Sequence, residues 1–220
     1  MTGPLVFDVN ETLLDLRALD PVFERLFGDA DARGDWFRQV LLSAMTVTLT
    51  GRYEDFSTVG AAALTMVAER RGVSLSSSDR QQVADGMRRL PPHPDVPAAL
   101  ARLHDEGCRL VALTNSPGGV MREQLTNAGI RRYFSDLLSV EDARALKPAR
   151  VVYETAARRL DTAPGELTMI AAHGWDLAGA MTAGWRTAFI ARPGQVLEPL
   201  FPRPEIVGAD LTEVANALLA

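Results

Sequence analysis

The sequence predicts a doubly wound, Rossmann-like α/β fold whose parallel-sheet core is interrupted by a helical insertion. From about residue 95 onwards, short apolar runs alternate with helical patterns, which is typical of parallel sheets with helices on both faces. Before that point, all but the first few residues show helical periodicity and no strand alternation. We therefore predict an α/β core domain of residues 1–15 and 91–220 and a helical cap domain of residues 16–90.

The first predicted strand, Leu5–Phe7, is followed directly by Asp8. Such an apolar run is typical of a sheet that is buried on both faces. A carboxylate at its end suits chemistry better than packing, since open α/β sheets bind ligands at the carboxyl ends of their strands. Capping of a turn or helix is the competing interpretation, because Asp often has that role. Asn10, Glu11 and Thr12 add further polar groups around the turn.

The predicted cap contains two sets of residues at helical spacing, which are Leu19, Phe23, Leu26 and Phe27, and Phe37, Leu41, Ala44 and Thr48. Each set falls on one face of a helix. Two more helices are predicted at about 53–71 and 78–89, separated by a polar turn. Three prolines between residues 91 and 94 then end the helical segment and mark the return to the core.

The remaining elements of the core alternate in type. Strands are predicted at 109–114, 137–140, 167–172, 186–191 and 206–209, and helices at 95–106, 117–128, 149–160, 176–183 and 211–219. The second strand ends in Thr114-Asn115-Ser116, just before the next helix. Free N–H groups at a helix start bind anions readily, although Ser and Asn are also ordinary turn residues.

The composition is that of an ordinary globular protein, with 47% hydrophobic and 23% charged residues. The net charge of -5 argues against nucleic acid or an anionic membrane as a partner. The single cysteine, Cys108, excludes an internal disulfide. No apolar run is long enough to span a membrane and the first residues do not form a signal peptide, so we expect a soluble cytoplasmic protein.

Only one of the 23 basic residues is a lysine, Lys147. A compact ammonium does what a planar guanidinium cannot, so a lone lysine in an arginine-rich chain invites a chemical explanation beside chance. It precedes a helix that carries Tyr153, for which packing on the sheet is an equal alternative to a role in a site. The fourth strand runs into residues 171–180, which contain His173, Trp175 and Asp176.

Four stretches of the chain resemble the four motifs of the haloacid dehalogenase (HAD) superfamily: LVFDVNETLLDL at 5–16, TNS at 114–116, Lys147-Pro148, and AAHGWDLAGA at 171–180. The fourth stretch is most similar to the type II L-2-haloacid dehalogenases, and the resemblance extends to GRYEDF at 51–56 in the predicted cap. It implies that Asp8 is a nucleophile and that the ammonium of Lys147 neutralises charge on it.

The resemblance also implies a set of site residues without a metal or cofactor. The catalytic residues would be Asp8, Thr12, Thr114, Asn115, Lys147, His173 and Asp176. The substrate-binding residues would be Asn10, Arg38, Leu41, Phe56, Ser116, Tyr153 and Trp175. Asp176, together with His173, is the candidate for activating the hydrolytic water, although an imidazole satisfied by a neighbouring turn is an equal alternative.

Three positions depart from the pattern of the type II dehalogenases. Asn10 stands where that group has a tyrosine, and His173 stands where it has an asparagine. Counting back from GRYEDF, Phe37 stands at the position of the arginine that binds halide or carboxylate, and Arg38 follows it. One residue along a helix is a rotation of about 100°, so Arg38 would point in a different direction from the residue at position 37. The three changes bear on the substrate more than on the nucleophile.

The expected function is the hydrolytic dehalogenation of 2-haloalkanoic acids, L-2-haloacid to D-2-hydroxy acid and haloacetate to glycolate. The partner would be this small substrate, and relatives suggest a homodimer formed partly through the cap. A magnesium-dependent phosphatase would have a second aspartate at position 10 and further acids near 173. The open alternatives are a HAD hydrolase of another small acid or a phosphate ester, and a catalytically idle HAD-like binding protein.

Overall fold

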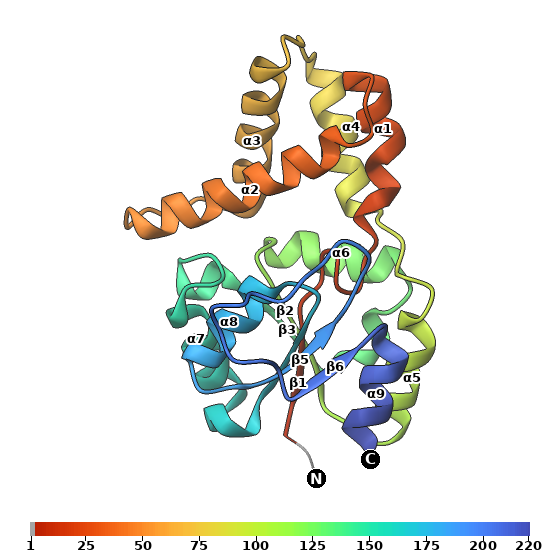
Figure 1. Ribbon diagram of the computed structural model, residues 1–220, viewed down its shortest axis with the longest axis vertical. Helices are drawn as coiled ribbons and strands as arrows, with labels where there is room; N and C mark the ends of the chain where they lie inside the picture. The colour runs from red at the N-terminus through yellow and green to blue at the C-terminus, as the bar shows by residue number, and fades with distance from the viewer. Residues whose placement is uncertain (1–2) are drawn as a thin grey trace.

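The computed structural model describes residues 3–220, which form a six-stranded parallel sheet flanked by helices (Figure 1). The strands are β1 (Leu5–Phe7), β2 (Leu110–Thr114), β3 (Asp136–Ser139), β4 (Thr168–Ala171), β5 (Arg186–Ile190) and β6 (Ile206–Gly208). The α-helices are α1 (Asp20–Phe27), α2 (Ala32–Leu49), α3 (Phe56–Arg70), α4 (Ser77–Arg88), α5 (Val96–Asp105), α6 (Gly118–Asn127), α7 (Arg150–Leu160), α8 (Gly174–Thr182) and α9 (Leu211–Leu219). Short 3-10 helices lie at Leu16–Leu19, Arg131–Tyr133, Val140–Ala143 and Pro164–Glu166.

The strand order β3-β2-β1-β4-β5-β6 places β1 between β2 and β4. The chain is wound outwards from β1 on one side through β2 and β3, and on the other side through β4, β5 and β6. The order therefore reverses beside β1, and this is where open α/β sheets bind their ligands. Phe7, the last residue of β1, is level with Ala112 and Ile170, so the residue after it emerges between two strand ends.

Helices cover both faces of the sheet, as predicted. Figure 1 shows α5 and α9 together on one side and α7 and α8 on the other. The strands between them are almost wholly buried, including every residue of β1, β2 and β4. Burial of both faces explains why these strands are continuous apolar runs rather than alternating ones.

The residues between β1 and β2 form the helices α1 to α4, which lie together at one end of the molecule in Figure 1. We refer to residues 16–90 as the helical insertion. The predicted faces are found there: Phe23, Phe37 and Ala44 are buried, and their partners at helical spacing are wholly or partly buried. The start of α4 is fixed by a capping box in which Ser76 and Asp79 bind each other's backbone N–H groups.

The predicted strands and helices are present, with boundaries that differ by at most three residues. The largest difference that affects the site is α8, which begins at Gly174 rather than at Asp176. The backbone of residues 196–198 lies against Gly174, where a Cβ would be only 2.7 Å from the nitrogen of Glu198. The close approach requires glycine, and it places Trp175 and Asp176 in the first turn of α8. Within residues 3–220, no helix is long and apolar enough to cross a membrane.

Candidate active site

Asp8 follows β1 at the point where the strand order reverses, and only 5% of its surface is exposed. Its backbone N–H continues the sheet by donating to the carbonyl of Ile170 at 3.0 Å. The side chain is held by Thr12, whose hydroxyl donates to Oδ2 at 2.7 Å. The same hydroxyl accepts from the backbone N–H of Ala172 at 2.9 Å. Thr12 therefore fixes the Asp8 carboxylate relative to the end of β4.

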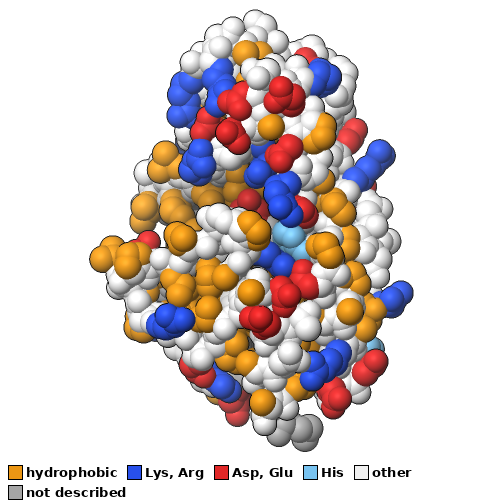
Figure 2. All heavy atoms as spheres, turned by 45° about the vertical axis from the view of Figure 1, so that its right-hand side comes forward, with side chains coloured by type: hydrophobic (Ala, Val, Ile, Leu, Met, Phe, Trp, Pro, Cys, Tyr) orange, Lys and Arg blue, Asp and Glu red, His pale blue; other side chains and the backbone are white. Residues whose placement is uncertain are grey.

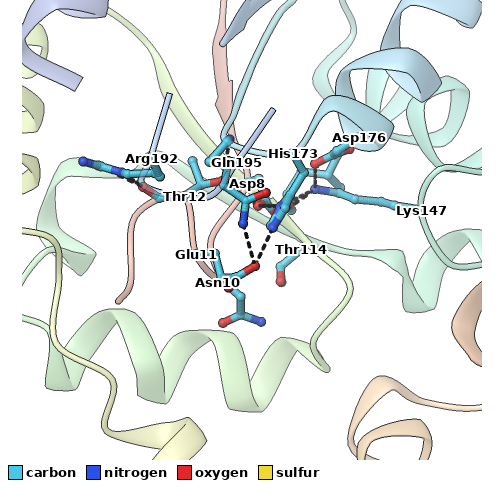
Figure 3. Close-up of polar contacts among 12 residues, drawn as sticks. Asp8, Asn10, Glu11, Thr12, Thr114, Lys147, His173, Asp176, Arg192 and Gln195 are labelled. Atoms are coloured by element: carbon cyan, nitrogen blue, oxygen red, sulfur yellow. Dashed lines mark hydrogen bonds and ion pairs between the residues drawn. The ribbon is translucent and has the colours of Figure 1, made fainter. Parts of the chain in front are cut away.

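Lys147 lies beside Asp8, although 139 residues separate them in the chain. Its Nζ donates to Asp8 Oδ1 at 3.2 Å, to the carbonyl of Leu113 at 2.6 Å and to Asp176 Oδ2 at 2.8 Å (Figure 3). All three ammonium protons thus have acceptors, and the side chain of Lys147 is fully buried. The expectation that the only lysine lies within reach of Asp8 agrees with this geometry.

The charges around Asp8 hold it in its ionised form. Burial alone raises the pKa of a carboxyl group, but the Lys147 ammonium and the contact with His173 outweigh it, so the pKa of Asp8 is below its ordinary value. For Lys147, burial acts to lower the pKa, and the two carboxylates Asp176 and Asp8 raise it above the ordinary value. Asp8 is therefore an oriented, ionised carboxylate, as a nucleophile requires.

Asp176 lies on the far side of Lys147 and has no exposed surface. Beyond its contact with Lys147, its Oδ1 accepts a hydrogen bond of 2.5 Å from the hydroxyl of Tyr153. Burial raises the pKa of Asp176, against the influence of Lys147. Tyr153 is itself fully buried, so its position beneath Asp176 combines core packing with support of the carboxylate. Both oxygens of Asp176 are thus engaged by protein groups.

His173, at the end of β4, lies between two carboxylates. Its Nδ1 is 3.1 Å from Asp8 Oδ2, and its Nε2 is 2.9 Å from Glu11 Oε2 (Figure 3). Burial acts to lower the pKa of His173, but the contacts with Asp8 and Glu11 raise it to about 10. The ring stacks on Trp175, with 5.0 Å between centroids, and Phe37 of the helical insertion lies 6.2 Å away. His173 is therefore a cation at neutral pH within the candidate site.

The last residue of β2 and the two residues after it form a hydrogen-bonded polar strand end. Asn115 Oδ1 accepts from the backbone N–H of Lys147 at 2.8 Å, which orients its amide. Thr114 is buried, and its hydroxyl accepts from the backbone N–H of Ser116. The Ser116 hydroxyl in turn accepts from the amide of Asn10 at 3.3 Å. The hydrogen bonds found among residues 3–220 involve Asn115 Oδ1 and not Nδ2, which leaves this donor for a ligand.

The helix start after Ser116, which the sequence suggested as an anion site, already contacts an anionic side chain. The backbone N–H of Gly118, the first residue of α6, donates to Glu141 Oε2 at 2.7 Å. Asn10 is likewise committed to protein contacts, since its Oδ1 accepts from the amide of Gln124 at 3.1 Å. Gly118 thus joins α6 to the 3-10 helix after β3, and Asn10 joins the loop after β1 to Ser116 and α6.

An apolar cavity of about 110 Å³ lies between the helical insertion and the core. Phe37, Phe56 and Ser116 line it, with further side chains from α3, α4 and α6. Figure 2 shows charged and histidine side chains gathered where the two parts meet, with hydrophobic side chains around them. Phe37 borders both the cavity and His173. The predicted apolar residue Phe56 is thus at the cavity, whereas Trp175 is at His173.

The two predicted substrate-binding residues of α2, Arg38 and Leu41, differ in their placement. The side chain of Arg38 is 73% exposed and pairs with Asp35 at 2.5 Å. It lines a surface hollow with Gln39 and Leu42, because the rotation of one residue from Phe37 turns it away from the core. Leu41 is half-buried against the hydrophobic core and lies outside the lining of the apolar cavity. The structure therefore turns Arg38 away from the candidate site, and Leu41 stays a predicted substrate-binding residue.

Sequence reasoning assigned no role in the site to four residues that contact His173, Glu11 or Thr12. Glu11 contacts the ring directly, and Gln195 donates to Glu11 Oε2 at 3.3 Å. Arg33 of α2 approaches Glu11 Oε1 at 3.8 Å. It lies four residues before Phe37, slightly more than one helical turn, so helical periodicity was an available signal. Arg192, after β5, donates to the carbonyl of Thr12 at 3.0 Å and had no such signal.

Residues 3–220 contain no group of three or more His, Cys, Asp or Glu side chains arranged to hold a metal ion. The place between the carboxylates of Asp8 and Asp176 is taken by the ammonium of Lys147. The amide of Asn10, two residues after Asp8, supplies a neutral group where a carboxylate would be a stronger ligand for Mg²⁺. The donors around Asp8 are therefore poorly suited to a divalent ion.

Comparisons with known proteins agree with this geometry. A family model described as haloacid dehalogenase-like hydrolase matches residues 5–184. The chain is 28% identical over 217 residues to an (S)-2-haloacid dehalogenase of Pseudomonas putida, with 98% of this chain and 96% of that protein covered. It is 27% identical over 203 residues to haloacetate dehalogenase H-2 of Moraxella sp. strain B, with 91% of each covered.

The fold is also similar to solved structures. One L-2-haloacid dehalogenase matches it with a TM-score of 0.95 at 25% sequence identity, covering 100% of this chain and 99% of the other. The similarity includes the helical insertion, because it extends over the whole chain. The chain therefore belongs to the haloacid dehalogenase-like hydrolases, and within them it is type II L-2-haloacid dehalogenase-like.

Proposed function

We propose that the protein hydrolyses small 2-haloalkanoic acids, converting L-2-haloacids to D-2-hydroxy acids and haloacetate to glycolate. The observation that carries the proposal is the ionised Asp8 carboxylate, held by Thr12 and by the buried Lys147 at the end of β1. Relatives over nearly the whole chain are an (S)-2-haloacid dehalogenase and a haloacetate dehalogenase. The site also fits this reaction because attack on carbon requires no divalent ion.

In the first step, an oxygen of Asp8 attacks C2 of the substrate and the carbon–halogen bond breaks. The electron pair of that bond leaves with the halide, and Asp8 becomes an ester. Attack from the side opposite the halide inverts C2, so an L-substrate gives a D-product. Lys147 keeps Asp8 ionised before attack, and the free Nδ2 donor of Asn115 is suited to bind the halide or the substrate carboxylate.

In the second step, water attacks Cγ of the Asp8 ester and releases the 2-hydroxy acid. The bond between C2 and oxygen stays intact, so the inverted configuration is kept. We propose that the helical insertion acts as a cap domain over the core, with Phe37 and Phe56 on its inner side. Exclusion of bulk water strengthens the electrostatic interactions around Asp8.

The test is halide release from L- and D-2-chloropropionate and chloroacetate, with p-nitrophenyl phosphate as the competing substrate and with or without EDTA. We expect halide release from the L-isomer and chloroacetate that survives EDTA and is abolished by Asp8→Asn. Magnesium-dependent phosphate release would instead support a phosphatase. Tight binding of 2-chloropropionate without halide release would support a binding protein.

Two further expectations are proposals for separate tests. Leu42 and Leu49 of α2 and Met66 of α3 are exposed on the helical insertion, at 60%, 85% and 43%, and they suit a homodimer formed partly through it. Light scattering at micromolar concentration distinguishes a dimer from a monomer.

A cytoplasmic location remains a prediction from the sequence, and fractionation of cells that express the protein tests it.

A further inference from the structure

The helical insertion borders an apolar cavity that neither step of the proposed reaction uses. The cavity has a volume of about 110 Å³ and lies between α2, α3, α4 and α6. Figure 1 shows α2, α3 and α4 together above α6. Protein interiors contain few voids larger than a water molecule. A preformed apolar cavity of this size beside a candidate site is therefore suited to bind part of a ligand.

Small residues on α3 and α4 leave the space open. Gly60 and Ala61 of α3 and Ala84 of α4 line the cavity, where larger side chains would fill it. The indole N–H of Trp36 donates to the carbonyl of Gly60 at 2.9 Å, and only 4% of Trp36 is exposed. A Cβ added at Gly60 would meet only Trp36, at 3.7 Å. A hydrogen bond therefore fixes this wall of the cavity, and space remains at position 60.

The lining suits a hydrocarbon group better than a charged one, because most of it is apolar. Two arginines, Arg80 and Arg88, also border the cavity, but their guanidinium groups bind partners outside the lining. Arg80 Nη1 donates to the hydroxyl of Thr65 at 2.8 Å. Arg88 Nη1 donates to Glu123 Oε2 at 2.8 Å. An arginine whose head is held elsewhere covers apolar surface with its aliphatic stem, so the two arginines do not make the cavity an anion site.

The cavity adjoins the place where the substrate would react. Phe37 lines it and also lies 6.2 Å from the ring of His173, which contacts Asp8. Ser116 lines it from the core and accepts a hydrogen bond from Asn10, two residues after Asp8. A chain attached to C2 of a substrate at Asp8 therefore has a path into the cavity between Phe37 and Ser116.

We propose that this cavity binds the alkyl chain at C2, so that the preferred substrates are 2-haloalkanoic acids with a straight chain of about four carbons there, as in 2-chlorohexanoate. An apolar cavity of about 150 Å³ holds the six carbons of a benzene ring, so a cavity of about 110 Å³ has room for about four. The inference rests on the proposed function, because it names the chain length for the same reaction. It makes Gly60 and Met87, which both line the cavity, determinants of specificity.

The first test measures kcat/KM by halide release for the L-isomers of 2-chloropropionate, 2-chlorobutyrate, 2-chlorohexanoate and 2-chlorooctanoate. Transfer of one methylene group from water to an apolar site gives a gain of about fourfold. We therefore expect kcat/KM to rise by about fourfold per carbon up to 2-chlorohexanoate and not to rise further at 2-chlorooctanoate. A kcat/KM that is constant or falls up to 2-chlorohexanoate, or that keeps rising by the same factor to 2-chlorooctanoate, would overturn the proposal.

Two variants should move the preference in opposite directions, which loss of the fold cannot do. Gly60→Leu fills the cavity, so the ratio of kcat/KM for 2-chlorohexanoate to that for 2-chloropropionate should fall by about tenfold or more. Gly60→Ala, whose Cβ fits beside Trp36, should lower the same ratio by about fourfold. Met87→Ala enlarges the cavity and should move the optimum to 2-chlorooctanoate. The matched control is Ala62→Leu, at an exposed position of α3 outside the lining, which should keep the original ratio. The same ratio in all of these variants contradicts the proposal.

Binding of acids that carry no halogen separates this inference from the proposed function. In isothermal titration calorimetry, hexanoate should bind more tightly than propionate by about 20-fold or more, and Gly60→Leu should remove this difference. If the protein releases no halide from any of the chlorinated acids, the proposed function fails, and the binding of hexanoate still decides whether the cavity takes an alkyl chain. Hexanoate that binds no more tightly than propionate would overturn the inference, even in a protein that releases halide.

Discussion

Replacement of Lys147 by methionine is expected to lower the free energy of unfolding by about 3–5 kcal/mol at pH 7, the usual cost of removing one partner from a buried ion pair. The ammonium donates to Asp8, Asp176 and the Leu113 carbonyl. Only 5% of Asp8 and none of Asp176 is exposed. Without the cation, Asp176 would lose its ion-pair partner and Asp8 would keep only His173, so two buried carboxylates would repel one another, although methionine fills a similar volume.

The assay is urea denaturation followed by tryptophan fluorescence, with Arg38→Met as the matched control. Arg38 also pairs with a carboxylate, but its side chain is 73% exposed, so we expect a change within about 0.5 kcal/mol. The double variant Lys147→Met with Asp176→Asn removes one uncompensated charge and should recover about 1 kcal/mol or more. The reasoning is refuted if Lys147→Met costs no more than Arg38→Met, or if the second substitution recovers nothing.

Three further predictions concern neighbouring contacts. Tyr153→Phe removes the hydrogen bond to Asp176 Oδ1 and should lower the free energy of unfolding by about 1.5–3 kcal/mol, measured by the same urea assay; an unchanged midpoint would show that this bond contributes nothing. Gly179→Ala places a Cβ at 2.6 Å from the Tyr153 ring and 2.7 Å from the Pro148 carbonyl, so thermal unfolding should show a loss of about 1–3 kcal/mol, and a rise in Tm would contradict the packing. The pKa of His173 is raised from 6.5 to about 10, so the stabilising contribution of its charged form is complete below about pH 6.5 and is lost as the pH rises through about 10. The free energy of unfolding, measured by urea denaturation, should therefore decline between these pH values. His173→Asn should reduce this decline.

The nucleophile and its cation could be predicted because each had an independent signal in the sequence. Asp8 stands at the end of an apolar run, where a packing explanation is weak. Lys147 is the only lysine in a chain with 23 basic residues. Neither signal predicted that Lys147 contacts Asp176 or that Tyr153 donates a hydrogen bond to Asp176. Those depend on the start of α8 at Gly174, where residues 196–198 approach the backbone closely, a tertiary contact with no local pattern.

The residues around His173 were harder to predict for the same reason. Glu11, which contacts His173, has a positive φ, and glutamate, unlike glycine or asparagine, gives no sign of such a conformation in a sequence. Gln195 lies in the loop after β5 and joins the site only through the fold. Arg38, in contrast, was predicted to bind substrate but does not lie at the site. It follows Phe37 by one residue, and the helical rotation between the two positions leaves the Arg38 side chain exposed.

The central claim is that a carboxylate oxygen of Asp8, and not water, attacks the carbon of the substrate. A single turnover in H₂¹⁸O, with protein in excess over L-2-chloropropionate, measures this directly. The account predicts that ¹⁸O enters the carboxylate of Asp8, detected by mass spectrometry of the peptide that contains it, and that the lactate carries ¹⁶O in its new hydroxyl. Lactate that carries ¹⁸O after one turnover, with no label in Asp8, would contradict the account.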